Sequence, residues 1–282
     1  MKRLLLAVMI ALALPMAGAG LADATPTATN ASCRHEFSDA EMQRLIALSD
    51  PAQLHDLYDA RTKVTEIAGI FSQYADYRGL FAIYYRDTLN SAIPALEDTR
   101  YEDMRWAWAA SFDFVDRYLT NLHGHLTGGS VAPWWQHHYA MTADCSKSPG
   151  RVLTSALNAH LIEDFPRALA KVGTTPANTG DFFAVGNDLI PTTPTIVADI
   201  KAVYGYDMSR FFQLYFVGDV VDPVFGDGTT SYVFSQAGRA QSFSFGLMLG
   251  PNPNSPAVLA AMDASFVATE AAMDGLAASG EL

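Results

Sequence analysis

Apolar residues recur every three or four positions through most of the chain, and this spacing constrains the fold more than any other feature. It is the spacing of amphipathic helices, whose buried stripe repeats with a period near 3.6 residues. A clear case is the set Leu54, Leu57, Tyr58, Val64, Ile67, Ile70 and Phe71. Alternating strand patterns are scarce, with short candidates only around Val220 and Tyr232. The sequence therefore predicts an all-α fold, a single domain of about ten helices over residues 38–282.

Capping residues mark where several of these helices begin. Ser38 and Glu41 have the spacing of a capping box, in which each side chain binds the other residue's backbone amide. Asp50 followed by Pro51 has the pattern of an N-cap and a first helical position. A glycine-containing loop is expected over residues 123–133. Further helices are expected over residues 79–96, 101–122, 134–143, 152–172 and 255–278.

The first 24 residues have the pattern of a secretory signal peptide. Lys2-Arg3 forms a positive region, Leu4–Pro15 is an apolar run, and Ala22-Asp23-Ala24 offers small residues to a signal peptidase. We expect cleavage before Thr25, a polar leader over residues 25–37, and export to the periplasm or the medium. No later run reaches 18 uninterrupted apolar residues, so no transmembrane segment is expected after cleavage.

Export changes the interpretation of the two cysteines. In an oxidising compartment Cys33 and Cys145 most simply form one disulfide. Closing so long a loop stabilises a protein by ~4–5 kcal/mol in the chain-entropy model. The alternative is two buried free thiols.

Composition and motifs exclude several functions. Half of the residues are hydrophobic and 11% are aromatic, so the chain can form a core. The net charge of −12, or −13 after loss of residues 1–24, repels phosphate backbones, so nucleic acid is not an expected partner. The sequence contains no Gly-x-Ser-x-Gly elbow, no phosphate-binding Gly-x-x-x-x-Gly-Lys-Ser/Thr loop and no Gly-x-Gly-x-x-Gly fingerprint. Common serine hydrolases, nucleotide enzymes and dinucleotide oxidoreductases are therefore disfavoured.

The segment Arg151–Lys171, here called the signature helix, carries the most informative polar residues. His160 and Asp164 are one turn apart, so they share a face beside the predicted core. An imidazole and a carboxylate in this register can hold a divalent metal such as zinc. Alternatively, Asp164 orients His160 as a general base. The third interpretation is a hydrogen bond that only ties helices together.

Two further features of the signature helix predict its shape and its surroundings. Pro166 has no amide hydrogen, which frees the carbonyl of Ile162 and predicts a kink beside the His–Asp pair. Positions i, i+4 and i+8 predict a solvated stripe of ion pairs on one side of the helix, formed by Glu163, Arg167 and Lys171.

The signature helix resembles that of an uncharacterised bacterial family. Its motif, Asn158-Ala159-His160-Leu161-x-x-Asp164-Phe165-Pro166-x-Ala168, is similar to the family pattern Asn-Ala-His-Ile-Asn-x-Asp-Leu-Pro-x-Ala. Weaker landmarks occur in the family's order at Tyr85–Thr88, Pro133-Trp134 and Asp181–Leu189, so the resemblance covers about residues 79–204. It implies an all-helical fold and no established reaction. The family's second Asn is Ile162 here, which removes one polar group from any site built on this motif.

The pattern His-x-x-x-Asp followed by Pro is also distantly similar to the helical zinc-dependent phospholipase C and single-strand nuclease group. There the corresponding His and Asp ligate zinc, which would assign that role to His160 and Asp164. Two departures weaken the comparison. The predicted mature chain begins at Thr25 instead of Trp, and Arg167 stands where that group has a His after the Pro.

Other histidines are candidate ligands for the same metal. His123 and His125 lie at the start of the predicted glycine-containing loop, where a His-x-His pair can chelate one ion. With His160 and Asp164 they would complete a four-ligand site, while the competing interpretation is that they are solvated loop residues. Arg86 is a candidate partner for an anionic or carboxylate group.

The second half of the chain is rich in large apolar residues, which indicates either core packing or a pocket for a small-molecule or lipid-like ligand. Two functions follow. The first is a metal-assisted hydrolase, with His160, Asp164, Asn158 and Arg86 as site residues and a metal-activated water. The alternative is a non-catalytic exported binding protein with a hydrophobic helical pocket.

Overall fold

A computed structural model describes residues 33–98, 100–213, 222–223 and 229–282. The predicted signal peptide, most of the polar leader and the strand candidate at Val220 lie outside these residues. The prediction of an all-α domain of about ten helices is confirmed, and the described residues contain no strand. Tyr232, the other strand candidate, lies in helix α13 (Thr229–Leu249), so that alternative was wrong. None of the described helices is both long enough and apolar enough to cross a membrane.

The N-terminal helices begin where the capping residues predict. Ser38 and Glu41 form the expected capping box at the start of α2 (Asp39–Ser49). Asp50 caps the short 3-10 turn that Pro51 begins. Helix α3 (Leu57–Ser72) then turns its apolar stripe inward, and Val64, Ile67 and Phe71 are fully buried.

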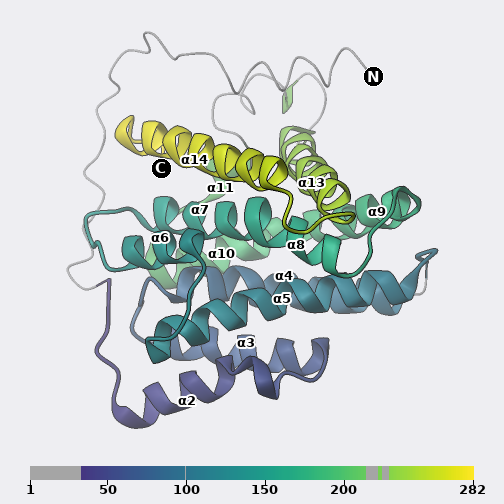
Figure 1. Cartoon of the computed structure of the whole chain (residues 1–282). Coiled ribbons are helices and arrows are strands. Elements are labelled where there is room, and N and C mark those ends of the chain that lie inside the picture. The colour runs from purple at the N-terminus through teal and green to yellow at the C-terminus, as the bar shows by residue number, and fades with distance from the viewer. Residues whose placement is uncertain (1–32, 99, 214–221, 224–228) are drawn as a thin grey trace.

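The helices are stacked in successive layers (Figure 1). Helices α2 and α3 form one end of the stack, and α4 (Gly79–Glu97) and α5 (Met104–Thr127) lie above them. The next layer contains α6 (Pro133–Thr142), α7 (Pro149–Asn158), α8 (Phe165–Lys171), α9 (Thr179–Leu189) and α10 (Thr193–Tyr204), followed by the short α11 (Ser209–Phe212).

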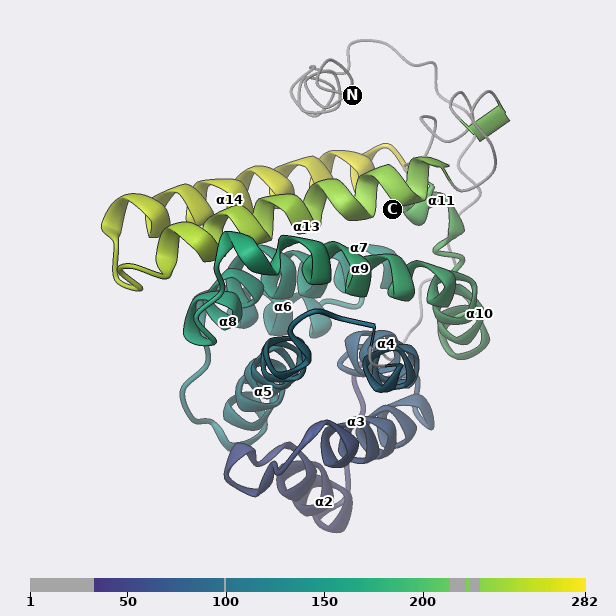
Figure 2. The same cartoon turned by 90° about the vertical axis from the view of Figure 1, so that its right-hand side faces the viewer.

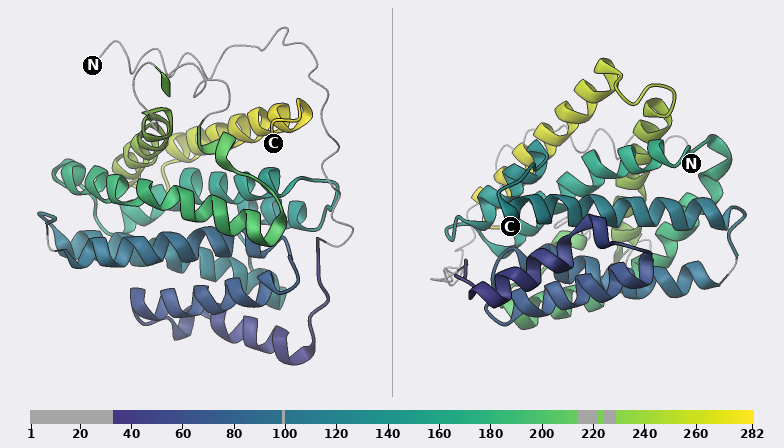
Figure 3. Two further views of the ribbon diagram at one scale, coloured as in Figure 1. Left: turned by 180° about the vertical axis from the view of Figure 1, so that it is seen from behind. Right: turned by 60° about the horizontal axis from the view of Figure 1, so that its bottom comes forward.

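Two long helices cover the other end of the stack. Helix α13 and helix α14 (Pro256–Ala278) are joined by a short connection and diverge from it across this face (Figures 1 and 2). From behind, α9 and α10 are seen between this pair and α4 (Figure 3). Gly246 permits the close packing of α13, because a Cβ there would lie 2.7 Å from the Cβ of Leu169 on α8. The pair therefore covers the signature helix.

The signature helix is continuous but irregular. It runs through α7, a π-helix over Ala159–Asp164 and α8. The amide of Phe165 donates to the carbonyl of His160, five residues earlier. Pro166 follows at once and cannot donate, so the wider turn accommodates the carbonyls it leaves free. The sequence predicts a kink beside the His–Asp pair, and the structure has a π-helix at this place.

The predicted solvated stripe on this helix was wrong at Glu163, whereas Lys171 is exposed as predicted. Glu163 is only 1% exposed, because α13 and α14 pack over that side. Arg167 reaches back to the Glu163 carboxylate, whereas Lys171 pairs with Asp113 on α5. The spacing of the charged residues predicted the ion pair between Glu163 and Arg167, but it did not indicate that two helices cover Glu163.

The two cysteines form the predicted disulfide. The Cα atoms of Cys33 and Cys145 are 5.2 Å apart, and 112 positions separate them in the sequence. Cys33 is fully buried. The bond links the segment before α2 to the connection between α6 and α7. It therefore joins two segments that are far apart in the sequence.

Candidate functional site

Asp164 is the centre of a buried hydrogen-bond network at the end of the π-helix. Its Oδ1 accepts a hydrogen bond of 3.0 Å from the indole of Trp134, and its Oδ2 accepts one of 2.7 Å from the indole of Trp135. Oδ2 also lies 3.1 Å from Nδ1 of His160. The carboxylate therefore joins the signature helix to α6, and donors already occupy both of its oxygens.

His160 lies in an aromatic cage and is 2% exposed. Its ring stacks on Phe114 with centroids 3.5 Å apart, and it makes edge contacts with Phe81, Tyr85 and Trp135. Burial lowers the pKa of His160, and the hydrogen bond to Asp164 only partly opposes this, so the imidazole is neutral at pH 7. Since the Asp164 oxygens accept, the proton is on Nδ1. Nε2 is buried without a hydrogen-bond partner among the described residues.

Asn158, the first residue of the family motif, contacts the C-terminal helix. Its side-chain amide donates to the carbonyl of Phe266 at 3.0 Å and to Oε1 of Glu270 at 2.8 Å. Glu270 also accepts from Arg151 at 2.6 Å and lies 2.8 Å from Nε2 of His137. This network attaches α14 to α7, which gives Asn158 a structural role away from the His160 ring.

The Glu270 network makes stability depend on pH. Burial alone raises the pKa of Glu270, but hydrogen bonds from His137, Arg151 and Asn158 outweigh it and lower the pKa to about 2 from 4.5. The network therefore stabilises the fold above pH 4.5 and loses its effect as the pH falls toward 2. This contribution is about 3 kcal/mol.

We expect Glu270→Gln to be less stable than the unaltered protein at pH 7 and to lose less stability on acidification. Urea unfolding at several pH values between 7 and 2 measures both effects. The matched control is Glu102→Gln, at an exposed position, which should leave both unchanged. Parallel pH profiles for the Glu270 variant and the unaltered protein would contradict the prediction.

The structure does not bring His123 and His125 to the His160 pair. Helix α5 continues through Thr127, so both histidines are helical and not in the expected loop. Residues two apart on a helix face different directions and do not chelate one ion together. Nδ1 of His123 lies 3.1 Å from the carbonyl of Ile46, whereas His125 stacks on Tyr139.

Arg86 is also engaged elsewhere. Its guanidinium pairs with Asp87, its neighbour on α4, and with Asp199 on α10. Two carboxylates therefore neutralise it. In the described ranges no three His, Cys, Asp or Glu side chains are grouped so that they could hold a metal ion.

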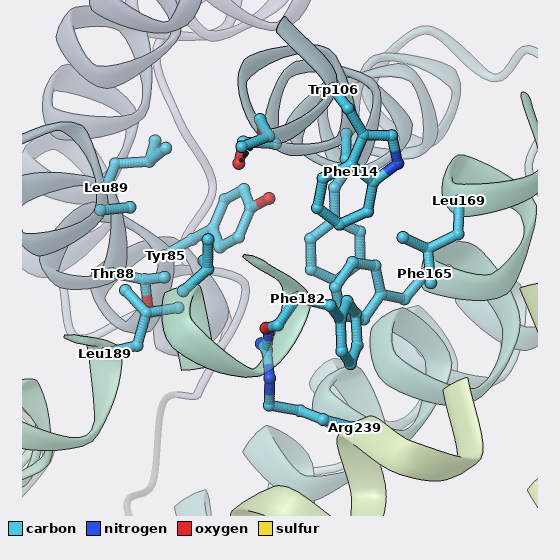
Figure 4. Close-up of a pocket in the computed structure, with 15 residues that line it drawn as sticks. Tyr85, Thr88, Leu89, Trp106, Phe114, Phe165, Leu169, Phe182, Leu189 and Arg239 are labelled. Carbon is cyan, nitrogen blue, oxygen red and sulfur yellow. Dashed lines mark hydrogen bonds between the residues drawn. The ribbon is translucent and has the colours of Figure 1, made fainter. Parts of the chain in front are cut away.

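A mostly apolar cavity lies beside the aromatic cage (Figure 4). Its volume is about 70 Å³, within a wider space of about 590 Å³ that is partly open to solvent. The cavity is therefore a narrow slot. Helices α4, α5, α8, α9 and α13 form its walls, with Tyr85, Thr88, Leu89, Ala92, Trp106, Ala107, Ala110, Ser111, Phe114, Phe165, Leu169, Phe182, Val185, Leu189 and Arg239 as lining residues.

The cage and the cavity share a wall. Phe114 is held between His160 and Phe165, whose ring centroids are 3.5 and 4.2 Å from its own. Phe114 and Phe165 both face the cavity, as does Tyr85. His160 lines neither this cavity nor the polar cleft beside Asp164, which also contains Asp113, Asp116, Arg117, Thr120, Asn121, Ser130, Ala132, Trp134 and Lys171.

Arg239 is the site residue that the sequence did not indicate. It is on α13 and stretches over Phe182, with its Cζ atom 4.4 Å from the ring centroid. Its Nη2 donates to the Phe182 carbonyl, and its buried Nε has no hydrogen-bond partner among the described residues. Gly186 on α9 leaves room for it, since a Cβ there would lie 2.3 Å from Nε. A single glycine in a helical pattern gives no sign of such a contact.

Fold and site together define an all-helical protein with a narrow apolar pocket beside a buried His–Asp pair. The chain belongs to DUF5995, a family of unknown function, whose sequence profile matches residues 58–237. The resemblance seen in the signature helix is thereby confirmed. No curated protein and no solved structure matched the chain in these comparisons, so the distant similarity to the zinc-dependent phospholipases and nucleases has no further support.

Proposed function

We propose that the protein is a non-catalytic binding protein that holds a narrow apolar ligand in the cavity between α4, α5, α8, α9 and α13. The observation that carries this proposal is the cavity itself, a slot lined mainly by aromatic and aliphatic side chains. Ligand sites are concave, largely apolar and equipped with a few polar groups. The narrowness of the slot suits an unbranched alkyl chain or a flat ring.

In this proposal the signature helix shapes the pocket. Asp164 fixes the His160 ring, and His160 supports Phe114 from behind. Phe114 in turn lies against Phe165, the residue next to Asp164. The His–Asp pair thus acts as the support of the pocket wall.

Metal-assisted hydrolysis at His160 and Asp164 has weaker support. Both oxygens of Asp164 accept hydrogen bonds from protein donors, and a metal would have to displace them. Metal analysis of purified, untagged protein tests this alternative. Stoichiometric zinc that disappears in His160→Ala would favour the hydrolase over the binding protein.

The binding proposal predicts that filling the slot abolishes ligand uptake. Ala110 is on the cavity wall and 5% exposed, and leucine there adds three carbon atoms to the narrow space. We expect Ala110→Leu to weaken binding of the neutral fluorescent probe N-phenyl-1-naphthylamine by at least roughly 10-fold, which corresponds to about 1.4 kcal/mol.

Titration of the probe, followed by its fluorescence, measures this effect. Ala109→Leu is the matched control, because Ala109 is the adjacent residue on the exposed side of α5. It should bind as the unaltered protein does. Equal affinities for all three proteins, or no binding to the unaltered protein, would overturn the proposed pocket.

We further propose that the protein works outside the cytoplasm. Residues 1–24 have the pattern of a signal peptide. The Cys33–Cys145 disulfide is typical of oxidising compartments. Cell fractionation of the native host, with detection of the N-terminus at Thr25, tests this assignment.

A further inference from the structure

The cavity has one charged lining residue in the described part of the chain, and this residue has no carboxylate partner there. Arg239 stands among aromatic rings, and no described Asp or Glu forms an ion pair with it. The other arginines near the cavity differ, since Arg86 pairs with Asp87 and Asp199, and Arg100 pairs with Asp188. An uncompensated guanidinium in apolar surroundings is costly, and an anion that binds beside it removes this cost.

The other polar groups of the cavity are mostly satisfied within the protein. The Trp106 indole donates to Thr174, and the hydroxyls of Thr88 and Ser111 donate to backbone carbonyls one turn earlier. The Tyr85 hydroxyl makes no hydrogen bond with the described residues. The unsatisfied donors that face a ligand are therefore those of Arg239 and Tyr85.

We propose that the ligand is a monocarboxylic acid with a narrow apolar tail, and that Arg239 binds its carboxylate. The inference rests on the proposed binding function and adds the chemical class of the ligand. A guanidinium presents a planar set of N–H donors that matches a carboxylate, and Nε of Arg239 has no hydrogen-bond partner among the described residues. One cation balances one negative charge, whereas a phosphate monoester would bring a second charge that nothing in the described cavity balances.

The charge of Arg239 persists at neutral pH. Burial lowers the pKa of Arg239 to about 10, which still leaves the guanidinium protonated at pH 7. Hydrogen bonds to charged groups contribute more than neutral ones, so a carboxylate should bind about 10- to 100-fold more tightly than the corresponding alcohol.

Competition against N-phenyl-1-naphthylamine with decanoic acid, 1-decanol and decyl phosphate at pH 7 tests the proposal. In the unaltered protein decanoic acid should compete most strongly. Arg239→Met should lower its affinity by roughly 10-fold or more and leave that of 1-decanol nearly unchanged. Arg105→Met, which removes an exposed arginine of α5, is the matched control and should behave as the unaltered protein.

A second variant guards against a folding defect in Arg239→Met. Gly186→Ala keeps the charge, but its Cβ would lie 2.3 Å from Nε of Arg239, so the guanidinium must move. It should reduce the preference for the acid over the alcohol. Equal affinities of the unaltered protein for the acid and the alcohol, or a preference for decyl phosphate, would overturn the carboxylate inference alone. Failure of the probe and of all three compounds to bind would overturn the binding function with it.

Discussion

Replacing Asp164 with alanine should destabilise the protein by about 4 kcal/mol, because two buried donors and one partly buried donor lose their acceptor at once. The indoles of Trp134 and Trp135 and Nδ1 of His160 all depend on this carboxylate. Asp164→Asn, which keeps the shape and one acceptor oxygen, should lose roughly half as much. Urea unfolding followed by circular dichroism measures both losses.

The matched control for this experiment is Asp263→Ala. Asp263 is an exposed aspartate on α14, and its removal should change stability by less than about 0.5 kcal/mol. If Asp164→Ala were as stable as the control, the carboxylate would not be a structural support. A stable variant that lost a bound metal would return Asp164 to the role of a ligand.

Loss of the disulfide should cost a similar amount. The double variant Cys33→Ala/Cys145→Ala removes a bond that closes a loop across 112 positions of sequence. In the chain-entropy model this bond restricts the unfolded chain, so the variant should lose about 4 kcal/mol of unfolding free energy. Unfolding in urea without reductant is the measurement.

Reductant provides the internal control for this prediction. Dithiothreitol during unfolding should lower the stability of the unaltered protein to that of the double variant and should leave the double variant unchanged. Equal stability of the unaltered protein with and without reductant would mean that the bond contributes nothing in solution.

The local features of the fold could be predicted from the sequence. The Ser38–Glu41 capping box depends on residues only three positions apart, and the structure has it. Pro166 likewise indicated an irregular helix, although the structure has a π-helix there and not the simple kink that was predicted. The His160–Asp164 contact is likewise fixed by one helical turn. The spacing of charges wrongly predicted that Glu163 is exposed, because the helices that bury it are formed by residues much later in the sequence.

The site was harder to predict, because distant segments assemble it. Trp134 and Trp135 bind Asp164 although 30 and 29 positions separate them from it in the sequence. Arg239 comes from α13, still farther along the chain. The glycines of residues 123–133 predict a loop that contains His123 and His125, and this prediction was wrong. In the structure α5 continues through Thr127, and Gly128, which has a left-handed φ of 69°, caps its C-terminus.

The contacts of α14 determine which part of the chain is needed for folding. The family profile ends at residue 237, inside α13, yet the ion pairs of the fully buried Arg151 come from α14, through Glu270 and Asp274. A chain that contained only residues 58–237 would leave the buried Arg151 without these ion pairs. It would also lack Cys33 and therefore the disulfide. We therefore expect that the stretch needed for a folded protein is longer than the stretch by which the family is recognised.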